Sequence, residues 1–152
     1  MAVDLSAFPK LTASNHRVTS DPSTTYNCIA WAAGRTDAWW EPLPAAGYYW
    51  PPGIPEDYSV GTLIALFCAL GYTPCSSASH ETGFEKVAIY AAEDEWEHAT
   101  RQLDSAVWTS KLGPDDDISH DGHDLLEGPK YAAVVQVLRR ATPGSAVPAW
   151  RD

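Results

Sequence analysis

Three short runs of β-type residues with tight turns between them constrain the fold of this chain more than any other feature. The runs are KVAIYAA (86–92), WEHATRQL (96–103) and AVWTSKLG (106–113). Only three or two residues separate them, which favours antiparallel neighbours, because parallel strands need a crossover of a dozen or more residues. The sequence therefore predicts an antiparallel meander, with a last strand over YAAVVQVLRR (131–140).

Two helices are expected before this sheet. DPSTTYNCIAWAAG offers Thr24 or Thr25 as an N-cap, an apolar helix, and Gly34 as its end. The second helix is capped by Asp57 or Ser59. It carries apolar residues at helical spacing: Val60, Leu63, Ile64, Phe67 and Leu70. Between the helices, the five prolines and five aromatic residues of segment 39–55 predict a rigid, irregular loop. The predicted class is α+β, with the helices first and the antiparallel sheet after them.

The chain of 152 residues is long enough for one domain with a real core. Residues 1–23 are polar and lack periodicity, so we expect an N-terminal arm laid over the domain. Residues 24–141 are expected to form a single domain. Residues 142–152, TPGSAVPAWRD, have the composition of a mobile tail.

Charge and composition exclude several classes of function. The formal net charge of −10 argues against binding to nucleic-acid backbones and to anionic membrane surfaces. No apolar run approaches the ~18 residues of a membrane span, and MAVDLSAFPKL lacks the features of a signal peptide. Three cysteines without paired spacing do not suggest a disulfide framework. We therefore expect a reduced cytoplasmic protein, or one exported by a specialised system without a signal peptide. The acidic segment 81–127 would favour a cationic protein partner, but solubility alone is the preferred explanation of its charge.

The cysteine at position 28 is the strongest chemical signal. In YNCIAWAAG it follows Asn27 at the expected start of an apolar helix. Backbone N–H groups and the helix dipole favour an anion there, so the pKa of the thiol is expected to fall. A nucleophilic thiolate also needs a proton carrier, and His98 is the best candidate, because this helix would pack on its strand. The alternative is a small buried cysteine in a tight helix–sheet contact, with His98 structural.

A helix with an N-terminal cysteine, followed by an antiparallel sheet bearing histidine, resembles the papain-like thiol hydrolases, including the NlpC-type cell-wall peptidases. Residues 26–140 also resemble an uncharacterised bacterial family in which NCIAWA, WWxP, YYWPPG, GFEKVAIY, HATRQL and WTSKLG recur as blocks. The second resemblance is the closer one, but no established reaction comes with it. The first implies a papain-like α+β fold, with the Cys28 helix packed on a sheet of four to six antiparallel strands.

The papain-like resemblance aligns in two registers. In the first, HATRQLDSAVWTSKLG makes His98 the base, and Ser110 or Lys111 stands where an asparagine orients the base. In the second, KVAIYAAEDEWEHA places Lys86 at the catalytic histidine position and His98 at the orienting position. Lysine is a poor general base at neutral pH. We favour the first register, in which Lys86 reaches solvent; in the second, its ammonium group points at Cys28.

Other candidate residues have both a functional and a structural interpretation. His120 is an alternative orienting residue, and Asn27 either positions an oxyanion or, as we favour, caps the helix. The aromatic loop either walls a substrate groove or covers the core. The groove residues would be Trp31, Trp40, Tyr49 and Trp50.

Metal binding is not expected. The HDGH stretch, with His120 and His123 among aspartates, matches no standard ligand spacing and is better explained as a solvated acidic loop. Cys75, Cys68 and His80 lack a fourth partner for zinc, and Cys68 falls among apolar residues of the second helix, where it is expected in the core.

The resemblance implies a thiol-dependent hydrolase or transferase acting on an amide bond of a peptide or protein substrate, as a peptidase, amidase or deamidase. Cys28 attacks, His98 relays the proton, and neither a metal nor an organic cofactor is needed. The main alternative is a non-enzymatic binding module that kept the fold and engages a protein partner through the aromatic loop and acidic face; Lys86 favours it. A third is an effector toxin with an immunity partner.

Overall fold

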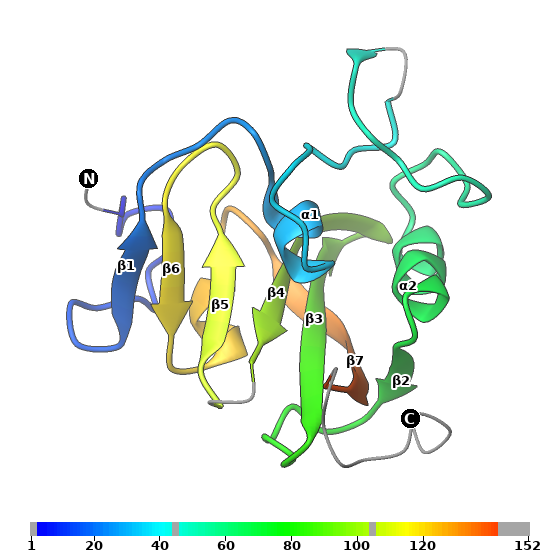
Figure 1. The fold of residues 1–152 in the computed structure, drawn as a ribbon. Coiled ribbons are helices and arrows are strands. Elements are labelled where there is room, and N and C mark those ends of the chain that lie inside the picture. Colours follow the sequence, from blue (N-terminus) through cyan, green and yellow to red (C-terminus); the bar gives the residue numbers. More distant parts are fainter. Residues whose placement is uncertain (1–2, 44–45, 104–105, 143–152) are drawn as a thin grey trace.

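The computed structural model describes residues 3–43, 46–103 and 106–142. Within them, the chain forms one seven-stranded sheet in the order β1-β6-β5-β4-β3-β7-β2 (Figure 1). The strands are β1 (His16–Ser20), β2 (Thr73–Cys75), β3 (Phe84–Ala92), β4 (Glu95–Gln102), β5 (Trp108–Lys111), β6 (Asp117–His120) and β7 (Ala133–Ala141). The helices are α1 (Cys28–Ala32), α2 (Val60–Ala69) and a short 3₁₀ helix, η2 (His123–Leu126). None of the helices in this part of the chain is both long and apolar enough to cross a membrane.

The predicted meander is present as β3, β4 and β5, and all three strands run antiparallel to their neighbours. Glu93 and Asp94 form the two-residue turn between β3 and β4, with φ of 51° and 66°. Positive φ at both positions matches the right-handed twist of a tight hairpin. The predicted last strand is also present, and β7 pairs with β3 rather than with β5. The three longest strands are therefore neighbours, in the order β4-β3-β7.

Three further strands extend the sheet at positions where the sequence predicted none. β1 lies within the expected N-terminal arm and pairs with β6, which lies within the expected loop after residue 114. β2 pairs with the other edge, along β7. β1 is an edge strand, and four of its five residues are exposed. This exposure explains why no repeating hydrophobic pattern marks β1 in the sequence. Such strands are held by backbone pairing more than by burial.

The predicted papain-like α+β arrangement is wrong. The described part of the chain is β-rich: beside seven antiparallel strands, its named helices are a five-residue α1, a ten-residue α2 and the η2 turn. The apolar sequence around α1 suggested a longer helix starting at Thr24 or Thr25, but its N-cap is Asn27 and the chain turns away at Gly34, where φ is 86°. The second helix was predicted correctly, with Ser59 as its N-cap.

The sheet buries side chains on both faces. We call the side that carries α1 and α2 the helix face; its core includes Ile29, Ile89 and Ala99. We call the other side the η2 face; its core includes Tyr90 and Tyr131, with η2 and the N-terminal segment packed over it. In Figure 1, α1 lies in front of the sheet over β4 and β5, and η2 lies behind it. Because successive strand residues point to opposite sides, each central strand contributes to both cores.

A β-bulge in β4 decides which residues reach which face. Along this strand the register shifts, so that His98 pairs with Tyr90 while Trp96 pairs with Ala91. Two residues apart in a regular strand, Trp96 and His98 would share a face. Because the bulge inserts one residue, Trp96 packs in the helix-face core and His98 lies beside Tyr90 on the η2 face.

Candidate functional site

Cys28 is the first residue of α1 and is buried on the helix face, within the same apolar cluster as Ile89 and Ala99. Burial raises the pKa of its thiol to about 11, although the backbone N–H groups of Ala99 and Ile29 act in the opposite direction. The helix terminus therefore does not yield a thiolate at neutral pH, because desolvation of the charged sulfur outweighs the N–H groups. The thiol behaves as a small apolar core residue that faces β4.

His98 is fully buried on the η2 face. Its ring stacks on Tyr131, with ring centroids 4.0 Å apart and an interplanar angle of 5°. Its Nε2 lies 3.2 Å from Ser110 Oγ, while Nδ1 has no hydrogen-bond partner in the described structure. Burial, with a smaller contribution from His120, holds the pKa of His98 well below its usual value. The ring is therefore neutral in the native protein at neutral pH.

Ser110 connects His98 to a second histidine. Ser110 Oγ lies 2.9 Å from His120 Nε2 and 2.6 Å from Thr100 Oγ1. His120 Nδ1 lies 2.8 Å from the Gly122 carbonyl, and since a carbonyl oxygen only accepts, Nδ1 carries the proton. Burial lowers the pKa of His120 to about 4. Ser110 and His120 thus both lie near His98, as predicted for orienting residues, but the cluster is neutral and enclosed.

The sheet separates the two residues predicted to react together. Cys28 lies in the helix-face core, which includes Ala99, while the neighbouring His98 points to the η2 face and stacks on Tyr131. The backbone of β4 therefore runs between the sulfur and the imidazole. The sequence predicted that His98 faces α1, because this helix was expected to pack on its strand. The helix does pack on β4, but the bulge places Trp96 on that face and His98 on the other.

The position of Lys86 differs from the one expected in each of the two registers. It neither reaches solvent nor faces Cys28: it is fully buried, and its Nζ donates to the Ser77 carbonyl at 2.7 Å and to Glu81 at 2.8 Å. Its neighbour on β4 is Gln102, two residues beyond Thr100 on the η2 face. The buried ammonium group pins the loop after β2 to the sheet.

Lys111 is also buried. Its ammonium group binds backbone carbonyls and does not orient the imidazole of His98, the role that the first register suggested. Its Nζ donates to the carbonyls of Ser23, Gly113 and Asp115, at 2.7, 2.5 and 2.7 Å. It also lies 5.1 Å from the ring centroid of Tyr26. Burial lowers the pKa of Lys111. This side chain joins the segment that precedes α1 to the loop between β5 and β6.

Asn27 caps α1, as the sequence predicted, and also fastens the aromatic loop. Its Oδ1 accepts from the N–H groups of Ala30 and Trp40, at 3.2 and 3.0 Å. Its Nδ2 donates to the Trp40 carbonyl at 2.7 Å. All of its amide contacts are therefore structural, so an oxyanion would have to displace a helix cap and a loop anchor.

The four residues predicted to wall a groove do not share one role. Trp40 and Trp50 are buried in the helix-face core, which favours the interpretation of the loop as a cover. Trp31 is half-buried and donates from Nε1 to Thr109 Oγ1 at 3.0 Å. Tyr49 is 42% exposed and packs against Trp40 in a tilted arrangement, with ring centroids 5.0 Å apart. Of these four residues, Tyr49 is the one that exposes a large part of its ring to solvent.

The family follows from a comparison of the whole chain with protein-family models. Residues 17–139 match the model described as "Domain of unknown function (DUF7689)". The chain belongs to the DUF7689 family. Neither the curated proteins nor the solved structures gave a match to this DUF7689 chain. The matched range begins inside β1, so the edge strand at the expected N-terminal arm is part of the family domain.

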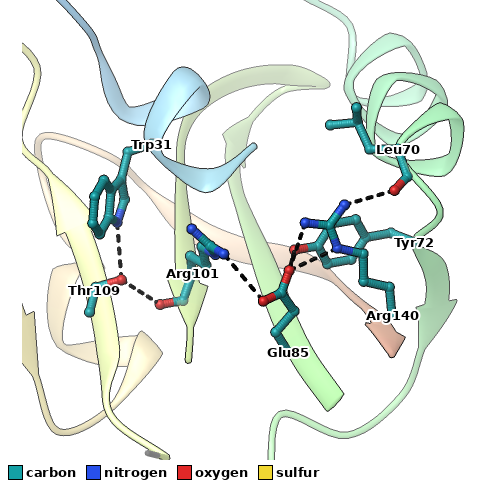
Figure 2. Close-up of polar contacts among 7 residues, drawn as sticks. All are labelled: Trp31, Leu70, Tyr72, Glu85, Arg101, Thr109 and Arg140. Carbon is teal, nitrogen blue, oxygen red and sulfur yellow. Dashed lines mark hydrogen bonds and ion pairs between the residues drawn. The ribbon is translucent and has the colours of Figure 1, made fainter. Parts of the chain in front are cut away.

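Sequence reasoning missed a buried ion network in this DUF7689 domain. Glu85 is 3% exposed on the helix face and lies between two arginines (Figure 2). Arg101 contacts it at 3.2 Å and Arg140 at 2.7 Å, while Tyr72 donates to it at 3.1 Å. Burial raises the pKa of Glu85, but the two arginines outweigh it and lower the pKa overall. The three charged residues Glu85, Arg101 and Arg140 are far apart in the sequence, so no local motif predicts that they meet.

The network continues across the sheet as far as α1. Trp31 donates to Thr109, which donates to the Arg101 carbonyl at 2.8 Å (Figure 2). At the other end, Arg140 donates to the Leu70 carbonyl at 2.8 Å, at the end of α2. Both helices of the helix face are thereby tied to the same strands. The arrangement is suited to holding α1 and α2 in place rather than to moving protons.

The remaining cysteines and histidines form no metal centre. Across residues 3–43, 46–103 and 106–142, no group of three or more His, Cys, Asp or Glu side chains is placed to hold a metal ion. All three cysteines are free thiols; Cys68 is exposed, which corrects the expectation that it lies in the core. The most accessible thiol is therefore on α2 rather than at the start of α1.

Proposed function

We propose that this DUF7689 chain is a non-enzymatic module that binds a cationic protein surface through its aromatic loop and the acidic hollow at the base of that loop. The proposal rests mainly on one observation: the aromatic loop exposes large apolar side chains, although Trp40 and Trp50 of the same loop are buried in the core. Leu43, Tyr48 and Tyr49 are 46%, 38% and 42% exposed. The thiol-hydrolase prediction has less support, because its nucleophile and base lie on opposite faces of the sheet.

Buried neighbours hold the exposed rings in position. Tyr48 lies against Trp39 with centroids 6.0 Å apart, and Tyr49 lies against the buried Trp40 at 5.0 Å. The backbone is also fixed, because the Glu41 N–H donates to Tyr49 O at 3.0 Å and the Tyr49 N–H donates to Trp39 O at 2.9 Å. Tyrosines held in this way lose little conformational entropy on binding, which is a property of interface hot spots.

The loop projects away from the sheet, and its base is fastened to the β3–β4 hairpin (Figure 1). Trp50 stacks on Trp96 with ring centroids 6.3 Å apart, and Tyr58 lies 4.9 Å from the same ring. Tyr58 also donates to Glu41 at 2.7 Å. A loop anchored at both ends and apolar at its tip fits a docking role better than a mobile lid.

Charge favours a cationic partner. A hollow where the end of the loop meets the β3–β4 turn is lined by Glu56, Asp57, Tyr58, Ser59, Glu93, Asp94 and Glu95, without a basic residue. Asp57 accepts from Thr62 Oγ1 at 2.6 Å, and this hydrogen bond lowers the pKa of Asp57. The formal net charge of −10 acts in the same direction over longer distances. Charges of one sign on an interface rim steer oppositely charged partners and exclude like-charged ones.

The test uses affinity capture followed by binding measurements with each recovered, purified protein. The partner should have a basic surface, and its Kd should rise with salt. Tyr48→Ser and Tyr49→Ser should each weaken binding about tenfold or more. Val135→Ser is the matched control, because Val135 is 51% exposed on β7, away from the loop. Cys28→Ser should bind as the wild type does.

Three results would overturn the proposal. The first is that both tyrosine variants bind the purified partner as tightly as the Val135 variant does. The second is that the recovered partners are acidic and bind independently of salt. The third is that the purified chain cleaves an amide bond and loses this activity in Cys28→Ser, which would restore the thiol mechanism.

A further inference from the structure

A cavity of about 240 Å³ lies between the N-terminal segment and the loop that joins β5 to β6. Its lining combines four apolar side chains with four charged ones: Val3, Ala7, Phe8, Leu112, Asp4, Asp115, Asp116 and Lys130. Phe8 and Leu112 belong to the core of the η2 face, so the cavity is an inlet into that core. None of its lining residues belongs to the proposed partner surface.

Asp116 is the unusual member of this lining. The residue is only 3% exposed, yet neither Oδ1 nor Oδ2 has a hydrogen-bond partner in the described structure. Asp4, in contrast, is exposed and accepts from Ser6 N and Ser6 Oγ at 3.0 and 2.6 Å. A buried carboxylate without partners is costly to keep and needs an explanation. A ligand that enters the cavity would supply one.

The protein's own cations make no hydrogen bond to Asp116, although Lys111 is close enough to interact with it electrostatically. An ammonium group has three donors, and Lys111 uses its donors on the carbonyls of Ser23, Gly113 and Asp115. Those contacts instead fix the loop that carries Asp116. Lys130 lines the cavity, but it makes no hydrogen bond to either Asp116 oxygen. The carboxylate therefore has two oxygens without hydrogen bonds, and because both are buried in the wall of the cavity, the Asp116 side chain has to turn toward a ligand to contact it.

The shape and chemistry of the cavity indicate the class of ligand. The described residues offer no group of three metal-ligating side chains here or elsewhere, so an organic cation fits better than a metal ion. Two free oxygens on one planar carboxylate match the two parallel N–H donors of a guanidinium. The apolar walls suit a short alkyl chain, and a cavity of about 150 Å³ already holds a benzene molecule.

We propose that this cavity binds an alkylguanidinium group, with Asp116 as its bidentate partner and Phe8 and Leu112 against its alkyl chain. The same group occurs in small molecules and in the arginine side chain of a polypeptide. The proposal does not depend on the aromatic loop, because the two surfaces share no residue.

The experiment measures binding of butylguanidine to the full chain by calorimetry, with butylurea as the neutral compound of the same shape. Wild type should bind butylguanidine and bind butylurea at least about tenfold more weakly. A second arm uses the capped peptide acetyl-Ala-Arg-Ala-amide. Tighter binding of the peptide than of butylguanidine identifies a polypeptide as the source of the group, and equal or weaker binding identifies a small molecule.

Variants assign the site. Asp116→Asn should weaken butylguanidine binding about thirtyfold or more, whereas the exposed Asp115→Asn should have a smaller effect and Asp21→Asn, outside the cavity, none. Asp116→Asn should also raise the melting temperature, because the buried charge is removed; the variant therefore stays folded. The proposal is overturned if wild type binds neither compound, if butylurea binds equally well, or if Asp116→Asn retains wild-type affinity.

Discussion

Glu85 and His98 lie on neighbouring strands of the same sheet, on opposite faces, and the protein buries them by different means. On the helix face, Glu85 stays ionised because Arg101 and Arg140 surround it, and their effect on its pKa outweighs burial. On the η2 face, His98 contacts the Ser110 hydroxyl and the rings of Tyr90 and Tyr131, and burial keeps it neutral. Glu85 is therefore held by paired charges and His98 by a neutral polar cluster, although the η2 face also contains the Lys86–Glu81 ion pair.

This difference bears on the chemistry expected of Cys28. The charged groups around Glu85 contact one another, and the Cys28 thiol in the core of the same face has a pKa of about 11. The imidazoles that would serve as bases are on the other face, within a cluster that includes Ser110. A buried histidine and a cysteine at a helix start are each compatible with catalysis, but the sheet keeps them apart.

The largest expected loss of stability comes from removing Glu85 from the ion network on the helix face. Glu85→Ala removes the centre of the network and leaves Arg101 and Arg140 without their carboxylate. Because breaking a buried ion pair leaves an uncompensated charge, the free energy of unfolding should fall by about 3 kcal/mol. Urea denaturation measures the change. Glu97→Ala, an exposed acid on β4, is the control and should change it by less than about 0.5 kcal/mol. A similar small loss in Glu85→Ala would show that the network does not hold the helices.

Acid should weaken the two faces in different pH ranges. His120 has a folded-state pKa of about 4 against 6.5 for an ordinary histidine. The unfolded chain therefore takes up the proton first, and stability is lost as pH falls from 6.5 toward 4, by about 3 kcal/mol for this residue. His98 adds to the loss in the same direction. Stability from Glu85, whose pKa is lowered, is lost only below its ordinary value of 4.5.

Chemical denaturation at a series of pH values separates these contributions. His120→Gln should flatten the stability profile between pH 6.5 and 4 and leave the part below 4.5 steep. Glu85→Gln should do the reverse. If His120→Gln keeps the full loss between pH 6.5 and 4, His120 does not titrate as a buried neutral group.

A smaller effect is expected at the start of α1. Asn27→Ala removes the N-cap and both contacts with the Trp40 backbone, which should lower the free energy of unfolding by about 1 to 2 kcal/mol. Asn27→Asp keeps the acceptor for Ala30 and Trp40 but loses the donor, so it should cost less. Equal losses in the two variants would mean that the cap and the Trp40 N–H contribute little.

The sequence predicted the elements with strong local patterns. The β3–β4–β5 meander, the last strand β7 and the second helix follow from periodicity and short connections, and Ser59 follows from N-cap preferences. For α1, Thr24 and Thr25 were wrong as N-caps, while Asn27, favoured as a capping side chain, does cap the helix. The strands β1 and β6 were missed, because each is four or five residues long and depends on pairing with a distant segment. Hydrophobic spacing does not contain that information.

The site was predicted less well, for a specific reason. Whether His98 faces α1 depends on the parity of β4, and a one-residue bulge changes that parity. Ser110 lies near His98 because β5 follows β4 in the meander, whereas His120 comes close to Ser110 through β6, a strand that was not predicted. Glu85 with its arginines was missed because ion pairs between residues 16 and 55 positions apart leave no motif in the sequence.

Native-state thiol labelling tests most directly whether Cys28 is a core residue rather than a nucleophile. With iodoacetamide at pH 6.5, the exposed Cys68 should react fastest, and Cys28 should react slowest, because its sulfur is buried and its pKa is raised to about 11. Labelling of Cys28 should rise only with urea, as the chain opens, and His98→Ala should not slow it. The account is contradicted if Cys28 reacts faster than Cys68 and Cys75 in the folded protein and if His98→Ala slows that reaction.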